Sequence, residues 1–286
     1  MPFLRKGDTV ALIACSDGWN PADRSALSIL IEQLRDLGLS VRLAQTIFRT
    51  ENRPFSGSPK ARAEQLMAFF RDPAVRMIFD LSGGDSANQI LPFLDYPAIA
   101  RSQAIFCGIS DLSVINNALY AQTGKHSIHY RIKNLTGSFA DAQINWFRRV
   151  LMGANSIAPP AYHWLRGQAM TGELIGGNLR CFLKLAATDY FPDPAGKIVL
   201  LEALGGGAAS CASLLAQLDQ IGVFRQCSGI VLGTFTAMRR SGEQPSIQQL
   251  ILAATARYQL PIAETEQIGH GDDAFGMEIG ATLQLD

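Results

Sequence analysis

Short apolar segments alternate with segments of helical spacing over the first 124 residues, and this alternation limits the possible fold more than any other feature of the chain. The predicted buried strands are residues 8–15, 40–45, 75–81 and 104–109. The predicted helices are residues 22–37, 59–71, about 86–94 and 111–124. Strands that alternate with helices form a parallel sheet with right-handed crossovers. The first half of the chain is therefore predicted to be an α/β domain.

The alternation breaks over residues 136–168, where a predicted helix at 140–152 is followed by a segment with two adjacent prolines and aromatic residues. The rest of the chain is richer in glycine and in strands, with helices predicted at 178–187, 209–221 and 246–257. A chain of 286 residues is long for a single hydrophobic core. We therefore predict an N-terminal α/β domain over 1–135, a linker over 136–168 and a β-rich C-terminal domain over 169–286.

Composition excludes several classes of partner. Basic and acidic residues balance at 25 each, so nothing favours nucleic acid or an anionic membrane surface. No apolar stretch approaches the ~20 residues of a membrane-spanning helix, and the first residues lack a secretory layout. The five cysteines include no C-x-x-C pair, which favours reduced thiols in a cytoplasmic protein and argues against a zinc site.

The sequence Gly-Ile-Ser-Asp at residues 108–111 ends the fourth predicted strand and begins a helix. A serine at such a corner has its hydroxyl lifted above the sheet, and the N–H groups that follow it point outward. A second turn, Ser-Gly-Gly-Asp-Ser at 82–86, follows the third strand. Ends of parallel strands meet at one crevice. We therefore predict Ser110 as a nucleophile, with the N–H of Asp111 and one near Gly84 or Asp85 binding an oxyanion.

A serine nucleophile needs a base, and a histidine base needs an orienting carboxylate. His270 lies between glycines in a segment typical of an exposed loop, and His126 and His129 follow the serine more closely in the sequence. The residues alone leave these three histidines open. Glu202 ends an apolar run, so a partly buried carboxylate is expected there.

Each of these signals has a simpler structural interpretation. A serine at this corner is more often a helix cap, and the turn at 82–86 is also compatible with phosphate binding. Asn178, after Gly176-Gly177, is compatible with a cap between a strand and a helix. Trp164 is a candidate for stacking on a ligand, although a partly buried linker aromatic is the more common case.

Taken together and in this order, the segments resemble the muropeptide LD-carboxypeptidase family, serine peptidases of murein recycling that also include the microcin self-immunity proteins. The segments that carry the resemblance are VALIACSDG, GGDSANQILPFLDY (83–96), FCGISDLSVINNALYAQTG (106–124), GELIGGNL (172–179), GKIVLLEAL (196–204), GIVLGTF (229–235) and IGHGDDAFGMEIGATLQLD (268–286). The resemblance implies Ser110 as nucleophile, Glu202 as orienting carboxylate and His270 as base. It covers almost the full chain.

The resemblance also implies a fold and a reaction. The fold is a flavodoxin-like or Rossmann-like parallel-sheet domain followed by a β-rich, swivelling-barrel-like domain with helices, with the triad across their junction. The reaction is cleavage of an L,D-peptide bond that releases D-alanine from cytoplasmic murein tetrapeptides, by a homodimer without metal or other cofactor. Asp85, Asn178 and Trp164 are predicted substrate contacts. The chain departs from the family at Ser82, where arginine is frequent, and at 129–131, where His-Tyr-Arg replaces His-Gly-Pro.

Other functions stay open on the sequence. The nearest is hydrolysis of an amide in a peptidyl-nucleotide antibiotic, which the turn at 82–86 and Asn88 slightly favour. Another is a non-catalytic ligand-binding relative. A nucleotide-binding α/β protein is disfavoured, because the turn lacks both the lysine of a P-loop and the third glycine of a dinucleotide fingerprint.

Overall fold

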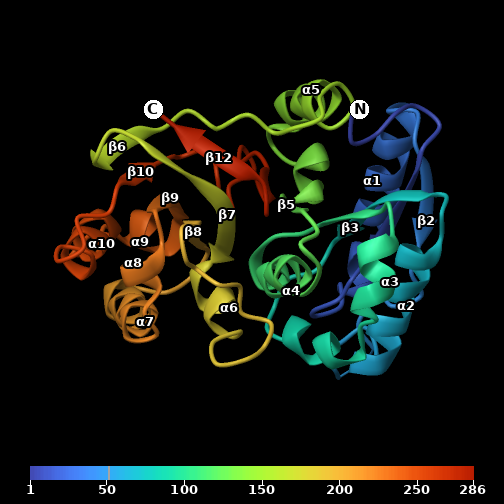
Figure 1. Ribbon diagram of the computed structural model, residues 1–286. Coiled ribbons are helices and arrows are strands. Elements are labelled where there is room, and N and C mark those ends of the chain that lie inside the picture. The colour runs from blue at the N-terminus through green and yellow to red at the C-terminus, as the bar shows by residue number, and fades with distance from the viewer. Residues whose placement is uncertain (51) are drawn as a thin grey trace.

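Two six-stranded sheets lie side by side, one formed mainly by the first half of the chain and the other by the second half (Figure 1). The structure is a computed structural model that describes residues 1–50 and 52–286. The first sheet is parallel and flanked by helices, and the second is curled into a half barrel. The predicted fold class is therefore confirmed.

The first sheet has the strand order β11-β5-β4-β3-β1-β2. Its strands are β1 (Thr9–Ile13), β2 (Ser40–Leu43), β3 (Val75–Asp80), β4 (Ile105–Cys107), β5 (Ser127–His129) and β11 (Met277–Ile279). The first five run parallel, and β11 is antiparallel to β5. The central strands are buried on both faces, which explains why they read as continuous apolar runs in the sequence.

Helices on both sides cover this sheet. They are α1 (Arg24–Asp36), α2 (Pro59–Arg71), α3 (Tyr96–Arg101), α4 (Ser113–Thr123) and α5 (Ala140–Val150), with 3-10 turns η1 (Pro21–Asp23), η2 (Ala87–Phe93), η3 (Ser110–Leu112) and η4 (Ile132–Thr136). The helix expected at about 86–94 is the 3-10 segment η2. Pro92 lies inside it, and a proline there removes a backbone donor and hinders regular α-helix.

The second sheet has the order β12-β7-β8-β9-β10-β6. Its strands are β6 (His163–Arg166), β7 (Met170–Asn178), β8 (Ile198–Ala203), β9 (Gly229–Phe235), β10 (Ile262–Glu264) and β12 (Thr282–Leu285). Its helices are α6 (Leu179–Leu183), α7 (Ala208–Gln220), α8 (Val223–Gln226), α9 (Thr236–Ser241) and α10 (Ile247–Ala254). The strands β7 to β10 are parallel, and the two edge strands are antiparallel to their neighbours. The edge strand β6 lies within the segment predicted as a linker.

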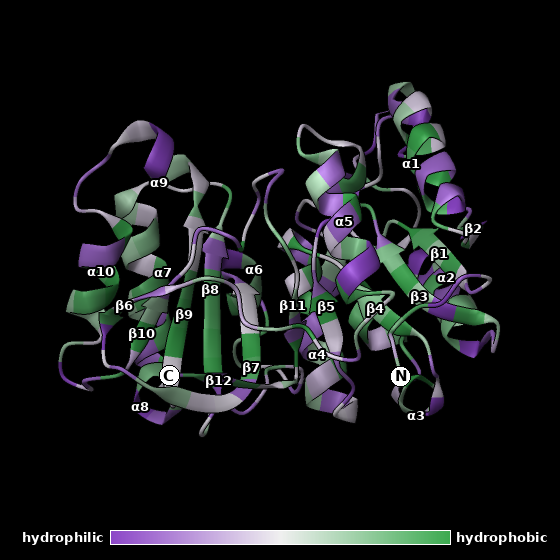
Figure 2. Cartoon of the chain, turned by 90° about the horizontal axis from the view of Figure 1, so that it is seen from above, coloured by the Kyte–Doolittle hydropathy of each residue, from purple (hydrophilic) through white to green (hydrophobic). Residues whose placement is uncertain are grey.

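Strand β11 connects the two halves of the molecule. Its backbone pairs with β5, while the side chains of Met277 and Ile279 pack in the apolar cluster under the second sheet. Figure 2 shows β11 and β5 at the edge of the first sheet that faces β7 of the second sheet, and the strands of both sheets are predominantly apolar. The second half of the chain thus contributes an edge strand to the first sheet, and the junction between the sheets is a continuous packed structure.

No helix among the described residues combines the length and the apolar character needed to cross a membrane.

Candidate active site

Ser110 lies three residues after the end of β4, at the start of η3, with a left-handed backbone (φ 63°). A non-glycine residue held in this conformation costs on the order of 1–3 kcal/mol, and such strain is concentrated at functional sites. Gly108 makes the tight corner possible, because a Cβ there would lie 2.7 Å from that of Leu112. The serine is therefore presented on a sharp strand-to-helix turn, as a nucleophile elbow requires.

The Ser110 side chain faces a cavity of about 240 Å³ at the carboxyl ends of the first sheet's strands. The lining residues are Asp80, Leu81, Ser82, Gly83, Gly84, Ile109, Ser110, Arg131, Ile132, Lys133, Leu204 and His270. Gly83 lies beside the nucleophile candidate, since a Cβ on it would be 3.8 Å from the Ser110 Oγ. Both sequence-predicted turns thus meet at one cavity, and the second half of the chain contributes His270 and Leu204 to its wall.

His270 is hydrogen-bonded to Glu202, and both belong to the second half of the chain. The Nδ1 atom of His270 lies 2.6 Å from Oε2 of Glu202, which is fully buried at the end of β8. Gly233 on the neighbouring strand leaves room for the carboxylate, because a Cβ there would lie 3.1 Å from that of Glu202. A buried carboxylate at Nδ1 orients the ring and favours the tautomer whose Nε2 can accept a proton.

The other ring nitrogen of His270, Nε2, has no hydrogen-bond partner among the described residues. His270 and Ser110 line the same cavity, but a hydrogen bond between them is not formed in this structure. Hydrogen bonds between a nucleophile and its base are frequently long without substrate and tighten in the complex. The arrangement therefore places all three predicted residues at one site, in which His270 is hydrogen-bonded to Glu202 and not to Ser110.

The remaining histidines lie elsewhere. His126 is paired with Glu278 and His163 with Glu264, both at exposed positions. His129 is fully buried on β5, with its Nε2 3.9 Å from Oε1 of Glu202, and it does not line the cavity. Burial lowers the pKa of His129 to about 4, an effect that the Glu202 charge opposes and that His270 reinforces. His129 is therefore neutral near pH 7, and its side chain lies beside Glu202 outside the cavity wall.

The predicted oxyanion donors lie on the two turns beside Ser110. Asp111 follows the serine in the first turn of η3, where amide groups have no partner within the helix. Gly84 lines the cavity with a positive φ of 119°, which favours glycine, and Asp17 occupies the space a side chain there would need. The geometry is compatible with two amides directed at a developing oxyanion.

The Asp111 side chain has a separate, structural role. It is fully buried and accepts hydrogen bonds from the Ser16 hydroxyl (2.6 Å), the Ala87 amide (2.8 Å) and the ammonium of Lys184 (2.5 Å). Lys184 belongs to the second half of the chain and also contacts Asp85. The nucleophile turn is thus fixed to the second sheet's domain by a buried ion pair.

The substitution Asp111→Asn is expected to destabilise the protein by about 3 kcal/mol, because it leaves the Lys184 ammonium without its buried counter-charge. Urea denaturation followed by circular dichroism measures the change. The matched control is Asp85→Asn, which removes an exposed carboxylate from Lys184 and Arg180 and should cost less than about 1 kcal/mol. Equal costs for the two variants would contradict the structural role of Asp111.

The three predicted substrate contacts lie outside the cavity wall. Asp85 is exposed and paired with Arg180 and Lys184. Asn178 is buried at the start of α6, where its side chain accepts a hydrogen bond from the Cys181 amide, as a helix cap does. Trp164 lies on the edge strand β6 against Tyr162, with ring centroids 5.6 Å apart.

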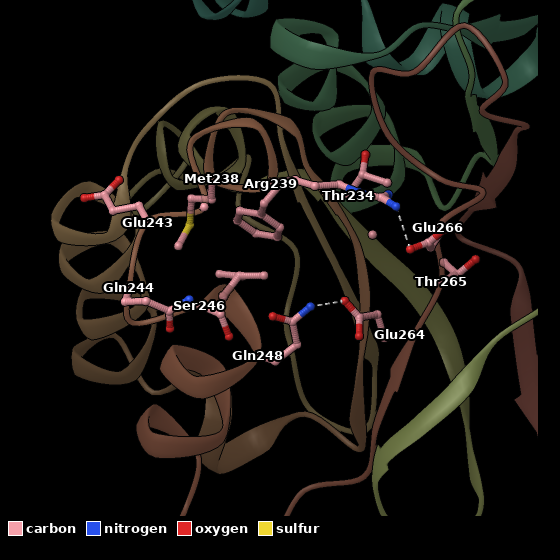
Figure 3. Close-up of a pocket in the computed structure, with 14 residues that line it drawn as sticks. Thr234, Met238, Arg239, Glu243, Gln244, Ser246, Gln248, Glu264, Thr265 and Glu266 are labelled. Atoms are coloured by element: carbon pink, nitrogen blue, oxygen red, sulfur yellow. Dashed lines mark hydrogen bonds and ion pairs between the residues drawn. The ribbon is translucent and has the colours of Figure 1, made fainter.

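A second cavity, of about 230 Å³, lies among β9, α9, α10 and the end of β10 (Figure 3). It includes neither Ser110, Glu202 nor His270. Three of its charged groups are already paired: Arg239 with Glu266 at 2.9 Å, and Glu264 with the Gln248 amide at 2.6 Å. Among the described residues that line it, no nucleophile is paired with a base, so the Ser110 cavity is the stronger candidate for chemistry.

Sequence reasoning missed two functional candidates. Arg131 and Lys133 line the Ser110 cavity from the segment after β5. The replacement of His-Gly-Pro by His-Tyr-Arg at 129–131 could have drawn attention to Arg131. No local sequence pattern indicates that Lys133 lines the cavity. Among the described residues, no cluster of three or more histidine, cysteine or acidic side chains has the geometry of a metal site.

Comparisons with known proteins agree with this architecture. Residues 10–130 match the family model described as the LD-carboxypeptidase N-terminal domain, and residues 171–285 match the model of the LD-carboxypeptidase C-terminal domain. The chain is 28% identical over 292 residues to the murein tetrapeptide carboxypeptidase of Pseudomonas aeruginosa, covering 97% of this chain and 92% of that protein.

The microcin C7 self-immunity protein of Escherichia coli is 23% identical over 316 residues, covering 99% of this chain and 92% of the relative. A solved structure of that immunity protein in complex with aspartyl sulfamoyl adenosine has a TM-score of 0.88 at 22% identity, covering 100% of this chain and 94% of the other. At that identity the structural match shows a shared fold.

Proposed function

Because the chain belongs to the LD-carboxypeptidase family, we propose that it is a serine peptidase that releases a C-terminal D-amino acid, D-alanine, from murein tetrapeptides. One observation carries the proposal. A serine held in a left-handed corner shares a cavity with a histidine whose far nitrogen bonds a buried carboxylate. These are the parts that covalent acyl transfer requires.

The proposed reaction begins with attack of the Ser110 Oγ on the carbonyl carbon of the last peptide bond. His270 Nε2, which has no hydrogen-bond partner in the described part of the chain, takes the hydroxyl proton and later delivers it to the nitrogen of the leaving amino acid. Glu202 orients the ring through Nδ1 and stabilises the imidazolium that forms. The amides of Asp111 and Gly84 bind the oxyanion, and losing one such donor typically costs about 3 kcal/mol of transition-state stabilisation.

Deacylation repeats these roles with water. After the amino acid leaves, His270 takes a proton from a water molecule, whose oxygen attacks the acyl-serine carbonyl. The bond between that carbonyl carbon and the Ser110 Oγ then breaks, the imidazolium returns its proton to the Oγ, and the shortened peptide leaves as a free acid. The cavity of about 240 Å³ is small, which suits a single terminal residue better than a long chain. We further propose that the protein acts in the cytoplasm as a homodimer, the assembly to be tested by sedimentation equilibrium.

The test of the function is release of free D-alanine from L-Ala-γ-D-Glu-meso-diaminopimelate-D-Ala, measured with a D-amino acid oxidase assay. We expect turnover of this tetrapeptide and none of the diastereomer that ends in L-alanine. Aspartyl sulfamoyl adenosine is the comparison substrate. Its hydrolysis in place of the tetrapeptide would assign the same site to peptidyl-nucleotide amides, and hydrolysis of neither would contradict the peptidase proposal.

A further inference from the structure

Two basic side chains that the proposed mechanism does not use line the Ser110 cavity. Arg131 lies two residues after the end of β5, and Lys133 lies in η4, the next short element. Strand β5 is the parallel neighbour of β4, whose end carries the serine. The cations and the nucleophile therefore emerge from adjacent strands at the same edge of the sheet.

Lys133 is a partly buried cation without an acidic partner. Its Nζ lies 3.9 Å from the centroid of the Trp19 ring, a cation–π contact. Among the described residues, no carboxylate lies within ion-pair distance of it, whereas Lys60, Lys184 and Lys197 each form such a pair. A desolvated ammonium that lacks a counter-charge favours binding of an anion.

Arg131 is more constrained. Its Nη1 donates to Asp272 at 2.9 Å and to the carbonyl oxygen of His270 at 3.4 Å. The guanidinium thus adds positive potential near the loop of His270, but much of its charge is already neutralised by Asp272. Lys133 is the cation in the cavity that remains available for a ligand.

The other polar groups on this wall are already engaged. The Ser82 hydroxyl donates to Asp80 at 2.5 Å and accepts from the Ser16 amide at 3.0 Å. Asp80 also accepts from the Cys15 amide at 2.8 Å. Burial raises the pKa of Asp80, against the effect of these hydrogen bonds. Neither Ser82 nor Asp80 is therefore a suitable anion ligand.

We propose that Lys133, supported by Arg131, binds the α-carboxylate of the substrate's C-terminal residue. This inference rests on the proposed function and adds the group that would make the enzyme a carboxypeptidase. The scissile carbonyl and the terminal carboxylate are separated by a single residue, and one residue spans about 3.8 Å. Both must therefore fit within the same small cavity, as Ser110 and Lys133 do.

Binding through Lys133 should depend on pH in a defined direction. Burial lowers the pKa of Lys133 to about 8, and the Arg131 charge acts in the same direction, while Asp23 and Asp80 oppose the shift. His270 also faces the cavity. The ammonium is charged below about pH 8 and neutral above it. KM for the tetrapeptide acid should therefore rise above this pH in the wild-type protein and not in Lys133→Met.

The experiment compares the tetrapeptide that ends in D-alanine with the same peptide ending in D-alaninamide, which lacks the terminal charge. We expect the wild-type protein to prefer the acid in kcat/KM by about 30-fold, as for loss of one charge-assisted hydrogen bond. Lys133→Met should lose that factor on the acid and change little on the amide, and Lys133→Arg should recover part of it. The control is Lys60→Met, at an exposed position on α2.

Two outcomes for Lys133→Met would overturn the assignment. One is an equal loss of kcat/KM on the acid and the amide, which indicates a structural role for Lys133, and the other is no loss on either peptide. If the wild-type protein hydrolyses neither peptide, the peptidase proposal fails. The carboxylate-binding role of Lys133 is then tested by calorimetric measurement of the binding of both peptides. Tighter binding of the acid than of the amide, abolished in Lys133→Met, would still support the carboxylate site. Equal binding, or no binding of the acid, would refute it.

Discussion

Replacing Ser110 with alanine is expected to lower kcat for D-alanine release by about 10⁴-fold or more, because the other hydroxyl among the described residues that line the cavity, that of Ser82, is hydrogen-bonded to Asp80. The residual rate would reflect oxyanion binding and substrate positioning alone. The assay is D-alanine release under substrate saturation, with the acyl-enzyme sought separately by mass spectrometry after rapid quenching.

The backbone of Ser110 supplies an internal control. Its φ of 63° is strained for both serine and alanine, whereas glycine adopts it freely. Ser110→Gly should therefore be as inactive as Ser110→Ala yet more stable than the wild-type protein, by roughly 1 kcal/mol in urea denaturation. Activity within tenfold of wild type in either variant would exclude Ser110 as nucleophile. A destabilised glycine variant would contradict the strained corner.

The local sequence pattern predicted most of the strands and helices of the first sheet's domain. The apolar runs and their glycine-rich ends predicted where Ser110 and the turn at 82–86 would meet, because parallel strands end at one edge. The burial of the Glu202 carboxylate was predicted from its place at the end of an apolar run. The choice of His270 over His126 and His129 needed the family resemblance, since no local pattern shows which loop crosses to the other sheet.

What the sequence did not reveal depends on contacts between distant segments. Strand β11 has three residues, and its partner β5 lies about 150 positions earlier, so the periodicity of the sequence does not predict that they pair. Asp111 illustrates the same point. The sequence around Asp111 does not indicate that its carboxylate pairs with Lys184, which lies 73 positions later in the chain. Such pairs arise from tertiary packing, which overrides local preference.

The site is divided between the two sheets, and its geometry depends on how they are joined. Ser110 follows β4 of the first sheet, whereas Glu202 lies on β8 of the second sheet and His270 on the loop between β10 and β11. Strand β11 and the pair Asp111–Lys184 cross the same junction. A shift of about 1 Å between catalytic groups can cost on the order of 100-fold in rate. Small movements at the junction would therefore open or close the gap between Ser110 and His270.

Glu202→Gln should lower kcat by about 10⁴-fold while leaving the fold intact. If the new amide presents its N–H₂ to Nδ1 of His270, the ring must carry its proton on Nε2 and cannot accept one from Ser110. If it presents its oxygen, the imidazolium loses a counter-charge that lies 2.6 Å away in the structure. Burial of a neutral amide costs less than burial of a carboxylate, so the melting temperature should not fall.

The matched control for this substitution is Glu264→Gln, which alters a second histidine–glutamate pair, that of His163, away from the Ser110 cavity. It should retain wild-type kcat. Steady-state kinetics of both variants on the murein tetrapeptide, together with thermal denaturation, separate the effects. If Glu202→Gln keeps more than a tenth of the wild-type kcat, the buried carboxylate serves packing rather than catalysis, and the base must be oriented by another group.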